Sequence, residues 1–478
     1  MNPFRNIKSL IKNQITKIVI DKKYAVSTTI VGSFNDSIGL SGISDIDLVI
    51  IVDILSEEIF NELVSSFKNI NCSELGLKDY DLIINDTFGP LKLNSKKSIV
   101  FHLMIYDVKG HVQHVEESPF TCHSWEQSNP LCGKSLKDIY PVINIQLSDL
   151  LESRRGISSY VNDIEKGRIT YRKYEFLNGN PIVVKDYFDL DIRHKLEYSF
   201  HITYHLINNL YKIITRKNES LNQEKLSEFY LNFDSEFEEN IVFFNELVLW
   251  KKSGKDNPQN IIERVKIFIN AVYILIKNID HSSNVICFKR HQKTKLNDGT
   301  FLGSKRNPSI DSMDDYTSKN KYNVGYHSKL RRSRETIKYY NCEILVETAL
   351  INEIDYGQAE GLTIIQLSNK FSKITSFWDK GLDPKFPEGE CQEDVLERVK
   401  KFIESEMQQS KDSLVVTHLV VLRMILLYFL EMPLKDMHKI QINHLEDYEF
   451  LNFKTYYSPK FSSEFRSKIR TQLSLING

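Results

Sequence analysis

The chain has little of several features that define common protein classes. Its 62 Lys and Arg residues nearly balance 63 Asp and Glu residues, so the formal net charge is −1. A near-zero charge removes the electrostatic argument for general binding to nucleic acid or to a membrane surface. The six cysteines are scattered without a CxxC pair and are too sparse for a disulfide scaffold. We therefore expect reduced, mostly buried thiols.

Long hydrophobic runs are also missing. No segment contains the ~20 consecutive apolar residues that a membrane-spanning helix requires. The stretch from Asn2 to Lys23 instead alternates apolar and basic residues, with the apolar ones at helical spacing. This pattern predicts an amphipathic helix packed on the first domain, with a membrane anchor as the alternative. Because no secretory leader is evident, we expect a cytoplasmic protein.

The pattern of apolar residues changes twice along the 478 residues, a length for which two or three domains are expected. Residues 1–145 contain strand-like runs around one helix, predicted at Ser56 to Asn69. Residues 146–282 have helical periodicity. Residues 283–478 begin with a short buried strand. The predicted fold is a multidomain α/β protein with an N-terminal α/β domain, a helical middle domain and a C-terminal domain.

A Gly-Ser pair and an Asp-x-Asp motif follow one another near the N-terminus. Gly32 and Ser33 come after a strand-like run, where a small residue lets the backbone and a hydroxyl approach phosphate oxygens. Asp45 and Asp47 precede the next apolar run, and residues at i and i+2 of a strand point to one face. Two such carboxylates suit Mg²⁺ or Mn²⁺ held between a triphosphate and an acceptor. A loop that only caps a strand is the alternative.

The joint pattern resembles the polymerase-β-type nucleotidyltransferase superfamily. Within it, the chain is most similar to the aminoglycoside nucleotidyltransferases, which pair such a domain with a helical C-terminal one. The resemblance implies that Gly32 and Ser33 bind the nucleotide. It also implies that Asp45 and Asp47 are catalytic metal ligands, completed by a third carboxylate on a neighbouring strand.

The third carboxylate is predicted within the stretch of residues 77–84. Asp81 is preferred as the third metal ligand and catalytic carboxylate because it precedes the apolar run, and Asp79, on the same face, is the alternative. His102 is interpreted as a core histidine rather than as a catalytic one. The base that activates the acceptor is not assigned by the sequence.

A second set of phosphate-chemistry residues lies in the last 200 residues. Hydrolysis through a phosphohistidine needs a nucleophilic imidazole, cations around the phosphoryl oxygens and an acid for the leaving oxygen. Arg290 and His291 directly follow a predicted strand, where active sites of α/β sheets lie. With Thr294 and Asn297 they resemble the Arg-His-Gly-Glu-Thr-x-x-Asn signature of the histidine phosphatase superfamily, the phosphoglycerate mutase-like fold.

The resemblance continues through the rest of the chain and implies an α/β/α domain. Residues 328–336 are similar to the family's Ser-Pro-Leu-x-Arg-Ala-x-Gln-Thr, residues 352–361 to the element with the proton donor, and residues 387–390 to its Gly-Glu-Ser segment. Residues 415–418 match the second histidine. The roles implied are nucleophile for His291, proton donor for Glu353, and phosphate ligand for Arg290, Arg332, His418 and Asn297.

Three departures from the family pattern bear on the substrate. Gln292 replaces the glycine after the histidine, Lys293 replaces an acid, and a family helix is missing between Pro308 and Ser328. The residue types needed for hydrolysis are nevertheless present. A pseudophosphatase that only binds phosphorylated ligands is the alternative.

Together the two resemblances predict a bifunctional enzyme. The first domain is expected to transfer a nucleoside monophosphate from an NTP to a small molecule with Mg²⁺ or Mn²⁺, and the last to hydrolyse a phosphomonoester without a cofactor. The expected partners are an NTP and a small phosphorylated substrate, with neither nucleic acid nor membrane. Consecutive steps toward a nucleotide-activated sugar or polyol would explain the pairing. The alternative is a regulatory, defence or resistance enzyme that modifies a protein, RNA or drug, with the phosphatase fold as sensor or reverser.

Overall fold

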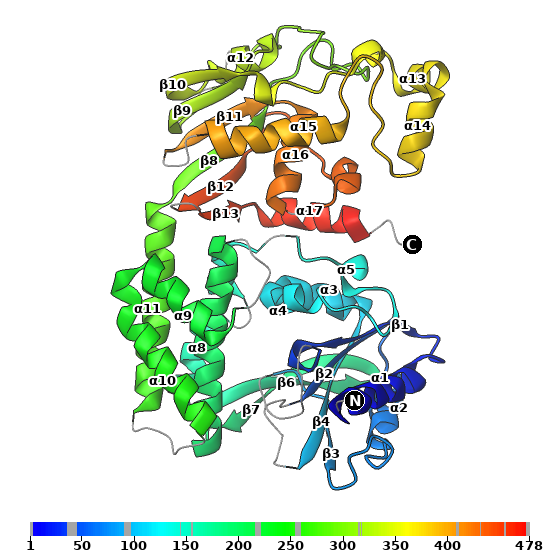
Figure 1. Cartoon of the computed structure of the whole chain (residues 1–478), viewed down its shortest axis with the longest axis vertical. Helices are drawn as coiled ribbons and strands as arrows, with labels where there is room; N and C mark the ends of the chain where they lie inside the picture. The colour runs from blue at the N-terminus through cyan, green and yellow to red at the C-terminus, as the bar shows by residue number, and fades with distance from the viewer. Residues whose placement is uncertain are drawn as a thin grey trace. The chain divides into compact units, whose positions relative to one another are not determined.

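The chain forms two compact units in the computed structural model, one up to about residue 277 and one that begins at Asn278 (Figure 1). The predicted boundary at residue 145 therefore lies inside the N-terminal unit. The structure describes residues 3–35, 45–89, 97–143, 145–153, 156–215, 221–253, 260–313, 316, 318–407, 411–430, 432–453 and 456–474.

A five-stranded sheet forms the centre of the N-terminal unit, in the order β3-β4-β2-β1-β5. Strand β2 is antiparallel to β1 and parallel to β4, and β4 is parallel to β3. The strands are β1 (Ala25–Val31), β2 (Ile46–Val52), β3 (Asp81–Asn85), β4 (Ser98–Asp107) and β5 (Cys132–Gly133). The helices around them are α1 (Pro3–Val19), α2 (Glu57–Lys68), α3 (Val108–Glu117), α4 (Pro119–Trp125) and α5 (Leu136–Ile139).

Both faces of this sheet are covered, because its central strands are apolar on both sides. Leu48 of β2 belongs to one core cluster with Ile15 of α1 and Phe67 of α2. Val49, which points the other way, packs in a second cluster with Trp125 of α4. The N-terminal amphipathic helix is thus confirmed as a helix whose apolar stripe packs in the core.

The middle of the chain adds helices to the same unit. These are α6 (Leu147–Glu152), α7 (Ile157–Glu165), α8 (Ile192–Thr215), α9 (Gln223–Phe233), α10 (Glu238–Ser253) and α11 (Ile261–Ser282). A purely helical region was nevertheless the wrong prediction, since β6 (Arg168–Leu177) and β7 (Asn180–Asp189) form a hairpin. Asn178 and Gly179 both have positive φ angles, 52° and 78°, as the two-residue turn of such a hairpin requires.

A six-stranded sheet forms the centre of the C-terminal unit, in the order β10-β9-β11-β8-β12-β13. The first four are parallel and β12 is antiparallel to both of its neighbours. The strands are β8 (Asn284–Arg290), β9 (Lys321–Ser328), β10 (Asn341–Thr348), β11 (Ser413–Thr417), β12 (Tyr448–Phe453) and β13 (Tyr456–Lys460). The helices are α12 (Arg331–Ile337), α13 (Ile364–Lys370), α14 (Ser372–Asp379), α15 (Gln392–Lys401), α16 (Leu419–Leu430) and α17 (Ser463–Ser474).

Helices lie on both faces of this second sheet. Ile337 of α12 packs in a cluster with Val416 of β11. Phe288 of β8 contacts Phe429 of α16, with ring centroids 6.0 Å apart. The carboxyl ends of β8, β9 and β11 therefore meet at one edge, where α/β proteins place their sites.

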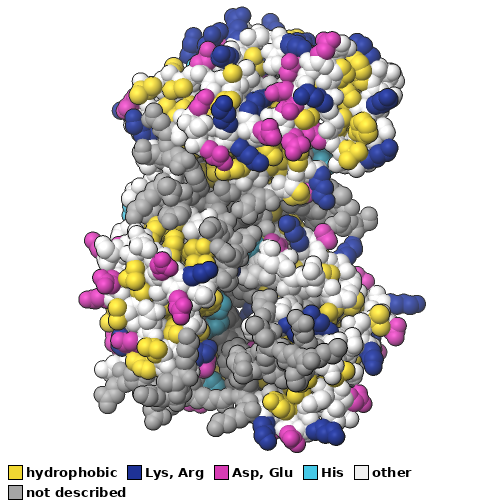
Figure 2. Space-filling model, in the orientation of Figure 1, with side chains coloured by type: hydrophobic (Ala, Val, Ile, Leu, Met, Phe, Trp, Pro, Cys, Tyr) yellow, Lys and Arg dark blue, Asp and Glu magenta, His cyan; other side chains and the backbone are white. Residues whose placement is uncertain are grey.

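Two predictions from composition have structural counterparts. None of the six cysteines, all of which lie in the described ranges, forms a disulfide; Cys122 and Cys287 are fully buried and the other four are half-buried. Within the described ranges, none of the helices has the length and apolar character needed to cross a membrane. On the face drawn in Figure 2, acidic and basic side chains are interspersed, as the near-zero net charge suggests.

Candidate active sites

The N-terminal motif aspartates lie beside His102. Asp47 is in β2 and pairs with His102 of β4, and the Asp47 Oδ1 lies 2.8 Å from the His102 Nδ1. Ligand atoms of Asp45, Asp47 and His102 all lie within 4.8 Å of one another. Asp45 and His102 are 7% and 6% exposed, whereas the Asp47 side chain is 28% exposed, so the cluster is partly open to solvent at Asp47.

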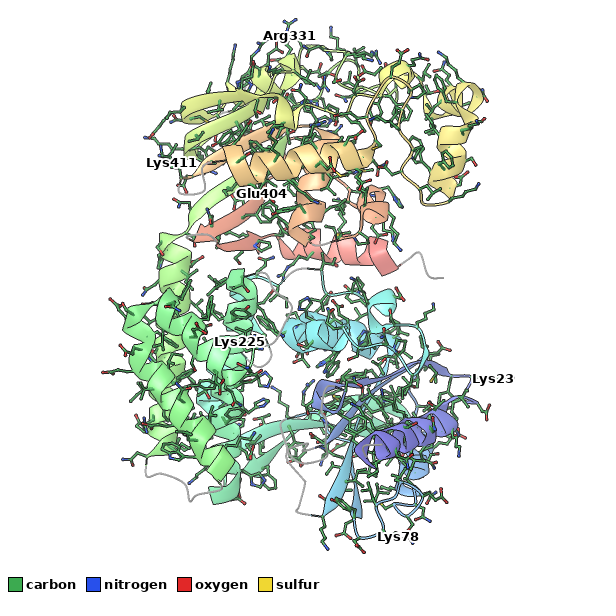
Figure 3. All side chains as sticks on the ribbon, viewed as in Figure 1. Lys23, Lys78, Lys225, Arg331, Glu404 and Lys411 are labelled. Atoms are coloured by element: carbon green, nitrogen blue, oxygen red, sulfur yellow. The ribbon has the colours of Figure 1, made fainter. Side chains whose placement is uncertain are left out.

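The predicted third carboxylate is not part of this cluster, which corrects the sequence interpretation. Asp81 starts β3 opposite Ser98, whereas Asn85, at the other end of β3, pairs with His102. The two rows are four residue steps apart along the strand, or about 13 Å. Figure 3 labels Lys78 in the loop that leads into β3, and Asp79 lies in that loop too. His102, expected to be a core histidine, occupies the predicted place of the third ligand.

Both ring nitrogens of His102 face acceptors. The Nε2 lies 2.8 Å from the carbonyl oxygen of Thr87, which accepts but cannot donate a hydrogen bond. Burial lowers the pKa of His102, but the hydrogen bond and charge of Asp47 outweigh burial and the pKa is raised. The two contacts hold the ring in one orientation between the Asp47 carboxylate and the Thr87 carbonyl.

Gly32 leaves room for the Asp47 carboxylate. Its φ is 74°, and a Cβ added there would lie 2.7 Å from the Asp47 Oδ2. The neighbouring Ser33 is exposed in a 3₁₀ turn, Gly32–Phe34. A larger residue at position 32 would displace the carboxylate, so one physical reason for the Gly-Ser pair is steric. Nucleotide binding by Gly32 and Ser33 stays a prediction.

A cavity of about 270 Å³ borders the cluster. Its wall includes packed rings: Tyr106 stacks on His114 and Trp125 lies tilted against it, each with its ring centroid 5.1 Å from that of His114. His201 and His205 of α8 also line it, and Figure 2 shows histidine side chains bordering a hollow in this unit. No local sequence motif predicts this wall, because its residues come from segments far apart in the chain.

The second site lies at the carboxyl ends of β8 and β11. The backbone N of His291, just after β8, donates to the carbonyl of Thr417, 2.9 Å away. His291 and His418 are 2% and 0% exposed, and their ring centroids are 5.0 Å apart. The two predicted histidines are therefore brought together.

Arg332 joins the two imidazoles. Its Nε lies 3.2 Å from the His291 Nε2 and 3.2 Å from the His418 Nδ1. Its two terminal nitrogens donate to the carbonyls of Arg306 and Gly303, at 3.0 and 2.9 Å. Burial lowers the pKa of Arg332 to about 10, so the guanidinium keeps its charge at neutral pH.

The hydrogen bonds define the protonation of both rings. The His291 Nδ1 lies 2.6 Å from the carbonyl oxygen of Gln292, so Nδ1 carries the proton and Nε2 a lone pair. The His418 Nε2 lies 2.7 Å from the Ser328 hydroxyl. Burial first, and then the charge of Arg332, lower the pKa of both histidines well below the usual value. A neutral His291 is a nucleophile at neutral pH.

Glu353 is a buried carboxyl group beside these rings. It is 5% exposed, and its two oxygens accept from the backbone N of Ile354 and of Leu419, at 3.0 and 3.1 Å. Burial raises the pKa of Glu353, although the charges of Arg332 and Arg290 oppose this. A carboxyl group with a raised pKa retains its proton to higher pH and suits an acid catalyst.

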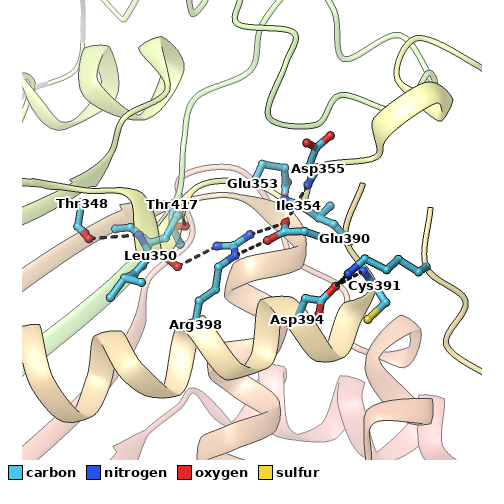
Figure 4. Close-up of polar contacts among 12 residues, drawn as sticks. Thr348, Leu350, Glu353, Ile354, Asp355, Glu390, Cys391, Asp394, Arg398 and Thr417 are labelled. Atoms are coloured by element: carbon cyan, nitrogen blue, oxygen red, sulfur yellow. Dashed lines mark hydrogen bonds and ion pairs between the residues drawn. The ribbon is translucent and has the colours of Figure 1, made fainter. Parts of the chain in front are cut away.

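An ion pair fastens the segment that carries Glu353 (Figure 4). The Arg398 Nε and Nη2 donate to the two carboxylate oxygens of Glu390, at 3.0 and 3.1 Å. Arg398 also donates to the carbonyl of Leu350 at 2.8 Å, and Glu390 accepts from the backbone N of Asp355 at 2.9 Å. The two contacts hold the chain on both sides of Glu353.

Arg290 and Asn297 differ in how they relate to the histidine pair. Arg290 donates to the carbonyl of Ile442 at 3.3 Å, and its buried Nε has no hydrogen-bond partner within the described part of the chain. A buried N–H without a protein acceptor suits an anion. Asn297 is exposed, and its amide oxygen accepts from the backbone N of Thr294 at 2.8 Å, which closes a turn. Its contact with phosphate stays a prediction.

A family model places this unit among known proteins. The histidine phosphatase superfamily (branch 1) matches residues 311–455. This range contains Arg332, Glu353 and His418, and it begins downstream of His291. The C-terminal unit carries a histidine phosphatase domain. We call it the phosphatase domain below.

Two curated relatives are 6-phosphofructo-2-kinase/fructose-2,6-bisphosphatases. The one from Caenorhabditis elegans is 35% identical over 95 residues, which are 19% of this chain and 20% of the relative. The one from Aquarana catesbeiana is 30% identical over 88 residues, 18% of each chain. The chain thus spans about a fifth of the length of the curated relatives it matches.

Two solved structures show a limited likeness to part of this chain. A putative alpha-ribazole-5'-P phosphatase from Escherichia coli is 18% identical, with a TM-score of 0.34, and the match covers 37% of this chain and 95% of that one. A mycobacterial glucosyl-3-phosphoglycerate phosphatase is 15% identical, with a TM-score of 0.29, and the match covers 37% and 97%.

One residue of the phosphatase domain escaped the sequence analysis. The His444 ring lies 5.4 Å from that of His291 between centroids, and its Nδ1 donates to the His291 carbonyl at 2.5 Å. Burial, and then the charge of Arg290, lower the pKa of His444 to about 4. His444 precedes β12 and lies 153 positions from His291, so no local motif marks it.

Proposed function

We propose that the phosphatase domain hydrolyses a phosphomonoester through a phosphohistidine on His291. The observation that carries the proposal is the position of Arg332, whose charged Nε contacts both neutral imidazoles. A phosphoryl group between the rings would meet this guanidinium at the atoms where negative charge develops. Arg290, whose buried Nε has no hydrogen-bond partner among the described residues, supplies a further donor.

The reaction has two balanced steps. In the first, the lone pair of the His291 Nε2 attacks phosphorus, the bond to the ester oxygen breaks, and Glu353 gives its proton to the departing alkoxide. In the second, the Glu353 carboxylate takes a proton from water, whose oxygen attacks phosphorus and releases phosphate from the imidazole. The ion pair of Glu390 with Arg398 keeps the carboxyl group in place for both.

The substrate class we propose is a sugar or polyol phosphate. The matched relatives carry the name fructose-2,6-bisphosphatase, and this chain covers about a fifth of each. Phosphate release from a panel of sugar mono- and bisphosphates, measured with wild-type protein and with His291→Ala, tests the proposal. The exposed His438→Ala is the matched control. Turnover that survives His291→Ala would refute the mechanism.

We further propose that the N-terminal unit transfers a nucleoside monophosphate from an NTP. The observation in favour is the Asp45, Asp47 and His102 cluster at a cavity, with Gly32 shaped to admit the Asp47 carboxylate. These residues fit a divalent ion, which would neutralise the triphosphate and favour departure of pyrophosphate. Arg172 in the cavity wall offers a positive charge toward phosphate, and the packed rings offer apolar surface to a nucleoside.

Release of pyrophosphate from each NTP tests this second proposal. We expect release with wild-type protein in a metabolite extract, loss of it with Asp45→Ala/Asp47→Ala, and retention with Asp81→Asn. Nucleotidylation of a phosphorylated sugar or polyol would place both activities in one sequence of reactions. Transfer to a protein, RNA or drug instead would favour the regulatory, defence or resistance alternative.

A further inference from the structure

The third ligand position of the N-terminal cluster has unusual chemistry for a magnesium site. Magnesium prefers oxygen ligands, whereas an imidazole nitrogen suits first-row transition ions. His102 is 6% exposed, and its Nδ1 is 2.8 Å from the Asp47 Oδ1, so the nitrogen lies among the carboxylates. The cluster therefore offers mixed nitrogen and oxygen ligands.

The surroundings of His102 determine which of its nitrogens is available. The Thr87 carbonyl, 2.8 Å from Nε2, accepts a proton from that nitrogen. Metal-binding histidines commonly donate their second ring N–H to a carbonyl in this way, which leaves the other nitrogen for the metal. Here that other nitrogen is Nδ1, the one directed at Asp47. Because Nε2 is occupied, His102 has no second nitrogen left to act as a base toward a substrate.

The Thr87 carbonyl is itself held in place. The side-chain oxygen of Asn85 accepts from the Thr87 backbone N and hydroxyl, at 3.1 and 2.8 Å. The next residue, Phe88, exchanges two backbone hydrogen bonds with Arg172 of β6, at 2.7 and 2.8 Å. The hairpin in the middle of the chain thus braces the turn that orients His102.

The other side of the cluster has the space that a ligand set needs. A Cβ at Gly32 would lie 2.7 Å from the Asp47 Oδ2, so glycine preserves the position of this carboxylate. The cavity of about 270 Å³ borders all three ligand residues. The oriented imidazole and the cavity are observations independent of the acidic motif.

We propose that Asp45, Asp47 and His102 form a mixed nitrogen and oxygen site for a manganese-type divalent ion, in place of an all-oxygen magnesium site. Its role in catalysis rests on the proposed nucleotidyl transfer. Metal binding is measured without nucleotide, so the proposed metal site and the proposed reaction can be refuted independently. If the ion binds as described but no pyrophosphate is released, only the reaction is refuted.

The test uses the full chain, stripped of metal and titrated with Mn²⁺ alone. Pulsed electron paramagnetic resonance detects a directly bound imidazole through modulation by its nitrogen nucleus. We expect this modulation with wild-type protein and with the matched control Asp81→Asn. We expect its loss with His102→Asp, which restores a carboxylate, and with His102→Gln. Thermal melting of each variant shows whether it is folded.

Relative affinity gives a second readout. Mutation of residues that merely support metal ligands typically changes affinity by about 10- to 100-fold, so removal of a ligand should do at least as much. We expect His102→Asp to lower the ratio of Mn²⁺ to Mg²⁺ affinity by about tenfold or more. Absence of Mn²⁺ binding, binding without nitrogen modulation, or a ratio unchanged in folded His102→Asp would each overturn the proposal.

Discussion

Replacement of Arg332 by alanine gives the sharpest prediction for the phosphatase domain. The change removes the charged Nε that lies 3.2 Å from each histidine. Loss of one donor to a developing anion costs about 10²- to 10³-fold in kcat, or about 3 to 4 kcal/mol. We expect a loss of at least this size, because the donor here is charged and 0% exposed.

Arg332→Ala should also lower the stability of the fold, so the role of Arg332 in catalysis and its role in stability can be measured separately. The carbonyls of Gly303 and Arg306 each lose a buried donor. An unsatisfied buried acceptor costs about 1 to 3 kcal/mol. Arg332→Lys restores a positive charge but not the planar set of N–H donors of a guanidinium. We therefore expect its kcat to lie between that of the alanine variant and that of the wild-type protein.

The assay is hydrolysis of p-nitrophenyl phosphate, with unfolding followed in denaturant. The neighbouring Arg331, labelled in Figure 3, provides the matched control. Its side chain is 54% exposed and pairs with Glu335 on the same helix, so Arg331→Ala should leave kcat within about twofold and stability within about 0.5 kcal/mol. A folded Arg332→Ala variant with kcat near that of wild type would refute the reasoning.

Four further outcomes follow from the same geometry. Since the raised pKa of Glu353 keeps its proton to higher pH, kcat should decline as pH rises through that pKa, and Glu353→Gln should lower kcat and remove this alkaline decline. Arg398→Ala should lower kcat with little change in KM, because Glu390 then holds the segment that carries Glu353 less firmly. A change in KM as large as the change in kcat would contradict this. Gly32→Ala should weaken Mn²⁺ binding without affecting phosphatase turnover, as calorimetry and the chromogenic assay can check. Burial lowers the pKa of His111 to about 4. The stability that the neutral ring contributes is therefore present above the unfolded pKa of about 6.5 and is lost as pH falls toward 4. His111→Phe should make the denaturation midpoint depend less on pH over that range.

The sequence predicted that His291, Arg332 and His418 come together, because these residues belong to local motifs. Arg290 and His291 directly follow one strand and His418 directly follows another, so parallel pairing alone brings them to one edge. Arg332 follows a third strand by a short turn. What the motifs omit is His444, which reaches His291 through an antiparallel strand far along the chain.

The N-terminal site shows where local reasoning stops. Strand β4 lies between β3 and β2, and its register against β2 places His102 opposite Asp47, while the register of β3 against β4 leaves Asp81 beside Ser98. A sequence pattern predicts on which face of a sheet a residue lies, but not which residue of the neighbouring strand lies opposite it. Register depends on contacts between segments, and the sequence pattern contains no information on those contacts that could decide against Asp81.

The missed hairpin has a different cause. Asn178-Gly179 is a strong local turn signal, and the flanking residues pair from Leu177 with Asn180 outward. Because the segments on both sides of the hairpin have helical periodicity, the pattern as a whole favours a helical region. In the structure this hairpin carries Arg172, which lies in the cavity wall and binds the turn beside Thr87.

In the proposed mechanism, His291 carries the phosphoryl group during turnover. Rapid acid-free quenching of the protein with a radiolabelled phosphomonoester, followed by peptide mass spectrometry, measures this directly. We expect one labelled peptide with the phosphoryl group on His291, and none with His291→Ala. Steady turnover with no labelled peptide at any quench time, or with the label on another residue, would contradict it.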